Sequence, residues 1–205
     1  MKSQRTSTPA DDLLLAATRE AVVVHGVRRT TANDIAERAG ISRMTFYRRM
    51  GSVDNAVLAA LTEEFRRHAG VAGHPASGTA RRQLVHFAVE SVRVFATSEL
   101  IASIAERDPE FLIPYVTDRF GASQQIVLDR LQALLDAGAA DGSIEASAGT
   151  ATTVLLAVQG VALSSRVLLK AGSFEATVAE LGKMLERFLT PSGATAAGAS
   201  RAGGE

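Results

Sequence analysis

The stretch from Thr31 to Met50 constrains the fold more than any other, because it predicts two short helices on either side of a tight turn. Thr31 can cap the first helix, and Asp34 three residues later completes a capping-box-like pair. Gly40 supplies the turn, where a positive φ favours glycine, and Ser42 caps the second helix. Two helices separated by so short a turn are typical of a helix-turn-helix.

The apolar residues of this stretch suffice to hold both helices on a core. Ile35, Ala36 and Ala39 give the first helix an apolar side, and Ile41 and Phe46 anchor the second. The other side chains of the second helix are not needed for packing in the core. They are Arg43, Met44, Thr45, Tyr47, Arg48 and Arg49. A helix of this size fits the major groove of DNA, where the residues near its N-terminus meet base edges.

The distribution of charge agrees with a nucleic-acid partner, although the whole chain is neutral. Its 205 residues include 22 Lys and Arg and 22 Asp and Glu. Residues 1–70 nevertheless carry a net charge of +3 and residues 71–205 a net charge of −3. Arginines on one short helix are more often a solvated face, so DNA binding is indicated by the coincidence of caps, turn, anchors and basic cluster in one window.

The rest of the chain also predicts helices, because no segment alternates apolar and polar residues and good helix formers dominate. Asp108 and Pro109 are expected to start a helix that Pro114 interrupts. The expected helices after the connection are Thr79–Thr97, Glu99–Arg107, about Tyr115–Ala137, Ala148–Leu169 and Phe174–Leu189. The expected organisation is a flexible segment (1–10), a DNA-binding domain (11–69), a connection (70–78), an effector-binding and dimerisation domain (79–190) and a flexible tail (191–205).

Several classes of protein are excluded by composition. The chain has no cysteine, so disulfides, thiolate metal sites and cysteine nucleophiles are absent. Its four histidines are scattered without metal-ligand spacing, and no phosphate loop or catalytic triad pattern occurs. We therefore expect no catalytic residue, metal or cofactor. Without a leader or a membrane span, we expect a cytoplasmic protein.

Residues 11–65 resemble the DNA-binding domain of the TetR/AcrR family of bacterial transcriptional regulators. The matching pattern comprises Thr31, Asp34-Ile35-Ala36, Ala39-Gly40-Ile41-Ser42, Thr45, Phe46-Tyr47 and the leucine-rich helix after Ser52. The resemblance implies an all-α fold, with an N-terminal three- or four-helix domain containing the helix-turn-helix. It also implies a larger C-terminal helical domain for ligand binding and dimerisation.

The resemblance implies a role in DNA binding for each matched position. Arg43 would read a base, because its guanidinium can pair with both acceptors of a guanine. Asn33 would lie near the groove edge, and Met44 and Thr45 would face bases. The residues that would contact phosphate are Thr31, Tyr47, Arg48 and Arg49, with a base contact also possible for Arg48. The family usually has a phosphate-binding lysine at the start of the fourth helix, where this chain has Val53.

A helix-turn-helix of this size usually works as a dimer on two half-sites. Two apolar stripes on the helix from 148 to 169 predict two partners, one of which would be a second subunit. The expected dimer residues on this and the last helix are Val154, Val158, Val161, Ser165, Leu168, Val178, Leu181, Leu185 and Phe188. The alternative is that the helix from 148 to 169 is buried entirely inside one subunit.

The family resemblance also implies an effector pocket enclosed by the middle helices. The candidate lining residues are His86, Phe87, Ser91, Phe95, Ile104, Phe111, Tyr115, Arg119 and Phe120. Their apolar character favours a lipophilic or aromatic effector. The function predicted from the sequence is thus a ligand-responsive homodimeric repressor of a palindromic operator. The alternatives are a small all-helical enzyme and a DNA-binding protein without an effector.

Overall fold

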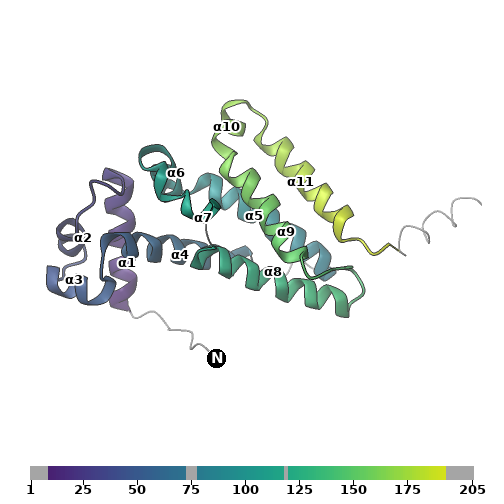
Figure 1. Ribbon diagram of the computed structural model, residues 1–205, viewed down its shortest axis with the longest axis horizontal. Helices are drawn as coiled ribbons and strands as arrows, with labels where there is room; N and C mark the ends of the chain where they lie inside the picture. The colour runs from purple at the N-terminus through teal and green to yellow at the C-terminus, as the bar shows by residue number, and fades with distance from the viewer. Residues whose placement is uncertain (1–8, 73–77, 118–119, 193–205) are drawn as a thin grey trace, which may run out of the picture. The chain divides into compact units, whose positions relative to one another are not determined.

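The computed structural model describes residues 9–72, 78–117 and 120–192, which form helices and no strand (Figure 1). The expected all-α fold is thus confirmed. Most of the expected flexible ends and connection lie outside the described residues. The helices are α1 (Pro9–His25), α2 (Ala32–Arg38), α3 (Arg43–Met50), α4 (Val53–Ala72), α5 (Ala80–Thr97), α6 (Glu99–Arg107), the 3-10 turn η1 (Pro109–Phe111), α7 (Pro114–Thr117), α8 (Ala122–Ala140), α9 (Thr150–Leu163), α10 (Ser165–Lys170) and α11 (Phe174–Leu189).

The chain divides into two compact units that do not follow the expected domain boundaries. Unit 1 comprises residues 1–66 and 97–123, and unit 2 comprises residues 67–96 and 124–205. The expected effector-binding and dimerisation domain (79–190) is therefore split between them. The reason is that α6 packs against α1 and joins the helices of the helix-turn-helix.

Unit 1 is built around a small core under α2 and α3. Leu14 of α1, Ile35 of α2, Phe46 of α3 and Ala56 of α4 are buried together in this core. Burial of an aromatic side chain such as Phe46 stabilises the fold by roughly 1.5–3 kcal/mol, which explains how a helix as short as α3 is held in place. Figure 1 shows α2 and α3 lying next to α1.

Unit 2 is held by packing between its long helices. α9 and α10 both contact α11, and Val154, Val158, Val178, Leu181 and Leu185 are buried. Ion pairs link the ends of α5 to α11, one between Arg81 and Glu186 and one between Arg93 and Glu175. Among the described residues, no helix combines the length and apolar character needed to cross a membrane.

Three expected helices differ from the structure. In place of the helix expected over about Tyr115–Ala137, α7 ends at Thr117 and α8 begins at Ala122. The helix expected over Ala148–Leu169 begins at Thr150 and is divided at Ser164 into α9 and α10. The helix expected to start at Asp108 is only the 3-10 turn η1, and the Asp108 side chain does not cap it. The Asp108 carboxylate instead accepts backbone hydrogen bonds from the loop between α1 and α2. This tertiary contact replaces the local cap that the sequence predicts.

Candidate DNA interface

The N-terminus of α2 is fixed by a reciprocal capping box. The Thr31 hydroxyl accepts a hydrogen bond from the Asp34 backbone N–H at 3.2 Å and donates one to the Asp34 carboxylate at 2.6 Å. The Thr31 backbone N–H donates to the same carboxylate at 3.0 Å. The Thr31 hydroxyl and, less strongly, its backbone N–H hold the pKa of Asp34 below its ordinary value. The box confirms the predicted cap and places the exposed Asn33 in the first turn.

The turn and the start of α3 also follow the sequence prediction. Gly40 has a φ of 65°, a conformation that costs other residues energy. Ser42 caps α3 by accepting a hydrogen bond from the Thr45 backbone N–H at 3.1 Å, and the two hydroxyls lie 3.0 Å apart. Phe46 then turns into the core, so the remaining face of α3 is left for solvent or a ligand.

The exposed face of α3 carries side chains suited to a nucleic acid. Met44 is 79% exposed and Tyr47 is 39% exposed, and both are large apolar side chains outside the core. The guanidinium of Arg43 stacks over the Tyr47 ring at 5.5 Å, and Arg48 is exposed beside them. α3 therefore presents donors, a phenol and a thioether together, which can meet base edges and phosphates.

The arginines of unit 1 are not equivalent. Arg49 forms an ion pair with Asp11 of α1 at 3.1 Å, and Arg38 forms one with Glu20 at 3.7 Å. Sequence reasoning assigned Arg49 to a phosphate but could not foresee its partner, which lies 38 positions earlier. It also did not single out Arg29, which is exposed just before α2 and makes no ion pair within the described part of the chain.

The start of α4 shows how the lysine-to-valine difference is accommodated. Val53 is partly buried and packs against the core of unit 1. Ser52 caps the helix by accepting a hydrogen bond from the Asn55 backbone N–H at 3.1 Å, and the Asn55 amide donates to the Met50 carbonyl. The helix terminus is thus well ordered and presents no basic side chain at Val53.

The expected effector residues do not come together in one described cavity. His86, Phe87, Ser91 and Phe95 follow one another along α5, where Phe87 is buried, His86 is exposed and the Ser91 hydroxyl donates to the Phe87 carbonyl. In unit 1, Ile104 is buried and Phe120 is 46% exposed. Arg119 lies outside the described residues, and so does the side chain of Tyr115.

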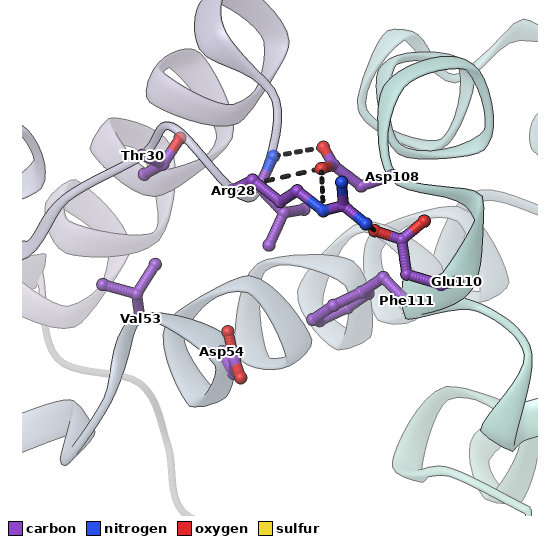
Figure 2. A pocket seen from close by; sticks show the side chains of 8 residues that line it. Arg28, Thr30, Val53, Asp54, Asp108, Glu110 and Phe111 are labelled. Carbon is purple, nitrogen blue, oxygen red and sulfur yellow. Dashed lines mark hydrogen bonds and ion pairs between the residues drawn. The ribbon is translucent and has the colours of Figure 1, made fainter.

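One cavity of about 290 Å³ lies inside unit 1, and Phe111 lines it (Figure 2). The other lining residues are Val27, Arg28, Thr30, Val53, Asp54, Asp108 and Glu110. Arg28 and the three carboxylates place charged groups beside Val27, Val53 and Phe111 in this lining, unlike the apolar effector pocket expected from the sequence. In the described part of the chain, no three His, Asp or Glu residues are grouped so as to hold a metal ion.

Most of the expected dimer residues are buried within the single chain. Val154, Val158, Ser165, Val178, Leu181 and Leu185 are all buried, and Val161 and Leu168 are partly buried. Only Phe188 of the nine is exposed, at 50%. The expectation is revised accordingly, because these stripes pair α9 and α10 with α11 of the same subunit. Leu169 is exposed on the side of α10 opposite Val167. The exposed apolar side chains that recur at helical spacing are Leu156, Leu163 and Val167 on α9 and α10, and Met184 and Phe188 on α11, which we call the apolar face.

Known proteins with similar sequences are regulators. A family model described as bacterial regulatory proteins, tetR family, matches residues 14–54. An uncharacterized HTH-type transcriptional regulator of Mycobacterium tuberculosis (strain ATCC 25618 / H37Rv) is 32% identical over 179 residues, covering 86% of this chain and 92% of that protein. A regulator of the same description from Mycobacterium bovis is 32% identical over 178 residues, with the same coverage of each chain.

Solved structures with the same fold include two complexes with small molecules. The transcriptional regulator FadR from Bacillus subtilis, in complex with stearoyl-CoA, has a TM-score of 0.63 and 13% identity over 87% of this chain and 98% of that one. The SmeT–triclosan complex has a TM-score of 0.60 and 18% identity over 91% of this chain and 94% of that one. These likenesses establish the fold. From the relatives' identity over most of both sequences, and from the family model on the helix-turn-helix, we conclude that this chain belongs to the tetR family of bacterial regulatory proteins.

Proposed function

We propose that the protein is a cytoplasmic, ligand-responsive, homodimeric repressor that binds a palindromic operator. The observation that carries the proposal is the exposed face of α3, where Arg43, Met44, Tyr47 and Arg48 are gathered while Phe46 anchors the helix. Groups of this kind read base edges and bind phosphates when a recognition helix enters the major groove.

Within this proposal, Arg43 reads a guanine, while Met44 and Thr45 lie against neighbouring bases and Asn33 lies at the groove edge. Thr31, Tyr47 and Arg48 bind phosphates. Arg49 also binds a phosphate once its ion pair with Asp11 is broken. We add Arg29, because it is an exposed cation close to the N-terminus of α2, where helix dipole and arginine favour the same anion. Arg29 would supply the charge that Val53 does not.

The proposed partner in the dimer is a second copy of the chain, bound through the apolar face. Leu156, Leu163 and Val167 recur at helical spacing on α9 and α10, and Met184 and Phe188 recur on α11. Exposed apolar side chains in such a group are typical of an interaction surface. A twofold-symmetric pair would present two recognition helices, which a palindrome requires.

The proposed effector is lipophilic or aromatic. The support is the apolar content of α5 and α6, together with the stearoyl-CoA and triclosan bound by FadR and SmeT, which share the fold. Binding of such a molecule would favour a conformation with lower affinity for DNA.

The proposal is tested by selecting sites from a random duplex library with the full-length protein. We expect enrichment of a palindrome whose half-site centres lie about 34–36 Å apart or a multiple of this distance. Repression requires that this site, placed over a reporter promoter, lowers transcription when the protein is expressed. Absence of any enrichment at low ionic strength would refute operator binding, because electrostatic attraction is strongest there.

The effector is tested separately with stearoyl-CoA and triclosan as probes. We expect at least one of them to release the selected duplex, whereas a sugar phosphate at the same concentration leaves it bound. Release by none of these probes would remove the support for a lipophilic effector and leave operator binding standing.

A further inference from the structure

The end of α1 is held by side chains from α6, which follows it by about eighty positions. The Ser103 hydroxyl donates a hydrogen bond to the Val22 carbonyl at 2.9 Å. The Arg107 guanidinium donates one to the Val24 carbonyl at 2.5 Å. The Val22 carbonyl also accepts the Gly26 backbone N–H at 2.8 Å, so Ser103 adds a second hydrogen bond there. The Val24 carbonyl is one of the last of α1, which have no partner within the helix, and Arg107 supplies its donor.

The Asp108 carboxylate holds the loop that follows. It is 3% exposed and accepts hydrogen bonds from the backbone N–H of Val27 at 2.6 Å and of Arg28 at 3.4 Å. The Arg28 guanidinium lies 3.7 Å from the same carboxylate and also pairs with Glu110. Figure 2 shows Asp108 directed at the loop, with Arg28 between it and Glu110. A buried carboxylate with charge-assisted hydrogen bonds is costly to remove.

Gly26 makes this approach possible. Its φ is 78°, and a Cβ built at this position would lie 2.7 Å from the nearer carboxylate oxygen of Asp108. Any side chain at Gly26 would therefore be strained and would displace the carboxylate.

On the side of α4, the loop borders a space that side chains leave open. The cavity of about 290 Å³ lies there, bordered by Val27, Thr30 and Val53. Val27 and Thr30 are buried, so packing holds the two side chains while the hydrogen bonds to Asp108 hold the backbone at Val27 and Arg28. The loop leads directly to Thr30, whose hydroxyl donates to the Gly26 carbonyl at 2.6 Å, and then to the cap of α2.

We propose that Asp108 is a positioning residue for DNA recognition. It fixes the loop from Gly26 to Thr30, and thereby the start of α2 relative to α1, without touching DNA. The proposal rests on operator binding by this chain and assigns a part in it to a residue far outside the helix-turn-helix.

The test compares Asp108→Ala and Asp108→Asn with Glu110→Gln in the full-length protein. Glu110→Gln is the matched control, because it removes a neighbouring carboxylate that pairs with Arg28 but bonds to no backbone group in the loop. The probe is a duplex selected by the wild-type protein, with a scrambled duplex as reference. Affinity is measured at a temperature where circular dichroism shows each variant fully folded.

We expect Asp108→Ala to bind the selected duplex about tenfold more weakly, with Asp108→Asn intermediate, since a hydrogen bond to a charged group is lost or weakened. Affinity for the scrambled duplex and the salt dependence of binding should stay unchanged, because no phosphate contact is removed. Amide exchange at Val27 and Arg28 should accelerate. Glu110→Gln should match the wild type in its affinity for both duplexes, in the salt dependence of binding and in amide exchange.

If the folded Asp108→Ala protein binds the selected duplex like the wild type, the proposal is overturned. It is also overturned if the affinity falls while exchange in the loop is unchanged. If Asp108→Ala does not fold, Asp108→Asn is compared with the wild type in the same two measurements, and its results decide whether the proposal stands. Failure of the wild-type protein to select any duplex would count against operator binding and not against the role of Asp108.

Discussion

The guanidinium of Arg43 lies 5.5 Å from the centre of the Tyr47 ring, one helical turn further along α3. The Tyr47 ring is itself in edge-to-face contact with Phe46, at 5.4 Å between centroids, and Phe46 is fully buried. The stack therefore connects an exposed cation to the core, and it restricts the rotamers of both side chains before DNA arrives. Preorganisation of this kind lowers the entropic cost of binding.

Replacing Arg43 with alanine should weaken binding to the selected operator by about 1–3 kcal/mol and relax the preference at one base position. The reason is the loss of a bidentate contact to guanine. Titration of the operator and of single-base variants measures both effects. Arg82→Ala is the control, since it removes an exposed arginine of α5 in unit 2. Unchanged affinity and preference would mean that α3 does not read DNA through Arg43.

Tyr47→Phe should weaken binding by a similar factor on every sequence. The ring and its contacts with Arg43 and Phe46 are retained, so only the hydroxyl that would donate to a phosphate is lost. Parallel titrations of operator and scrambled DNA measure the change. A selective loss on the operator would show instead that the hydroxyl contributes to base recognition.

Arg48→Ala should reduce the slope of log affinity against log salt by about one, because one phosphate contact is lost. Arg49→Ala should change this slope less, since Arg49 must first leave Asp11. Fluorescence anisotropy over a range of salt concentrations makes the comparison. Equal changes for both variants would show that phosphate displaces the Asp11 carboxylate completely.

Acid should weaken the capping box of α2. The pKa of Asp34 is lowered in the folded chain, so its carboxylate contributes stability that is complete above its ordinary value of 3.8 and is lost as the pH falls through the folded value. The difference in melting temperature between the wild type and Asp34→Asn should thus be largest near neutral pH and shrink in acid. Thermal melts across this range provide the measurement. A difference independent of pH would contradict the linkage.

Val167→Glu and Phe188→Glu should convert the proposed dimer to monomers, because each places a carboxylate on the apolar face. Both side chains are at least half exposed in the single chain, so the substitutions leave the core of a subunit intact. Sedimentation velocity measures the mass. Leu13→Glu introduces the same charge at an exposed leucine of α1 and should leave the dimer unchanged. Dimers that persist in both test variants would place the interface elsewhere.

The features that sequence predicted well are local ones. Thr31, Ser42 and Gly40 act through hydrogen bonds and backbone angles within a few residues, so their roles can be inferred from spacing alone. The identity of Phe46 as an anchor follows from its isolation among polar residues. The fold class and the surface composition of α3 were also predictable, because both follow from local sequence patterns.

The features that sequence did not predict depend on distant partners. The pattern Asp-Pro suggests a cap at Asp108, and only the tertiary structure brings its carboxylate to the loop after α1. The two stripes of α9 are apparent from periodicity, but which of them meets α11 depends on packing. Arg49 was likewise assigned by position, and its ion pair with Asp11 depends on how α3 lies against α1.

The membership of α6 in unit 1 has a practical consequence for dissecting the protein. A fragment that stops within α4, near Arg66, would contain every residue expected to touch DNA but would lack Ser103, Arg107 and Asp108. The Val24 carbonyl would lose the hydrogen bond from Arg107, and the side of α1 that packs against α6 would be exposed to water. We therefore expect that a fragment made to bind DNA must extend to about residue 123, where unit 1 ends.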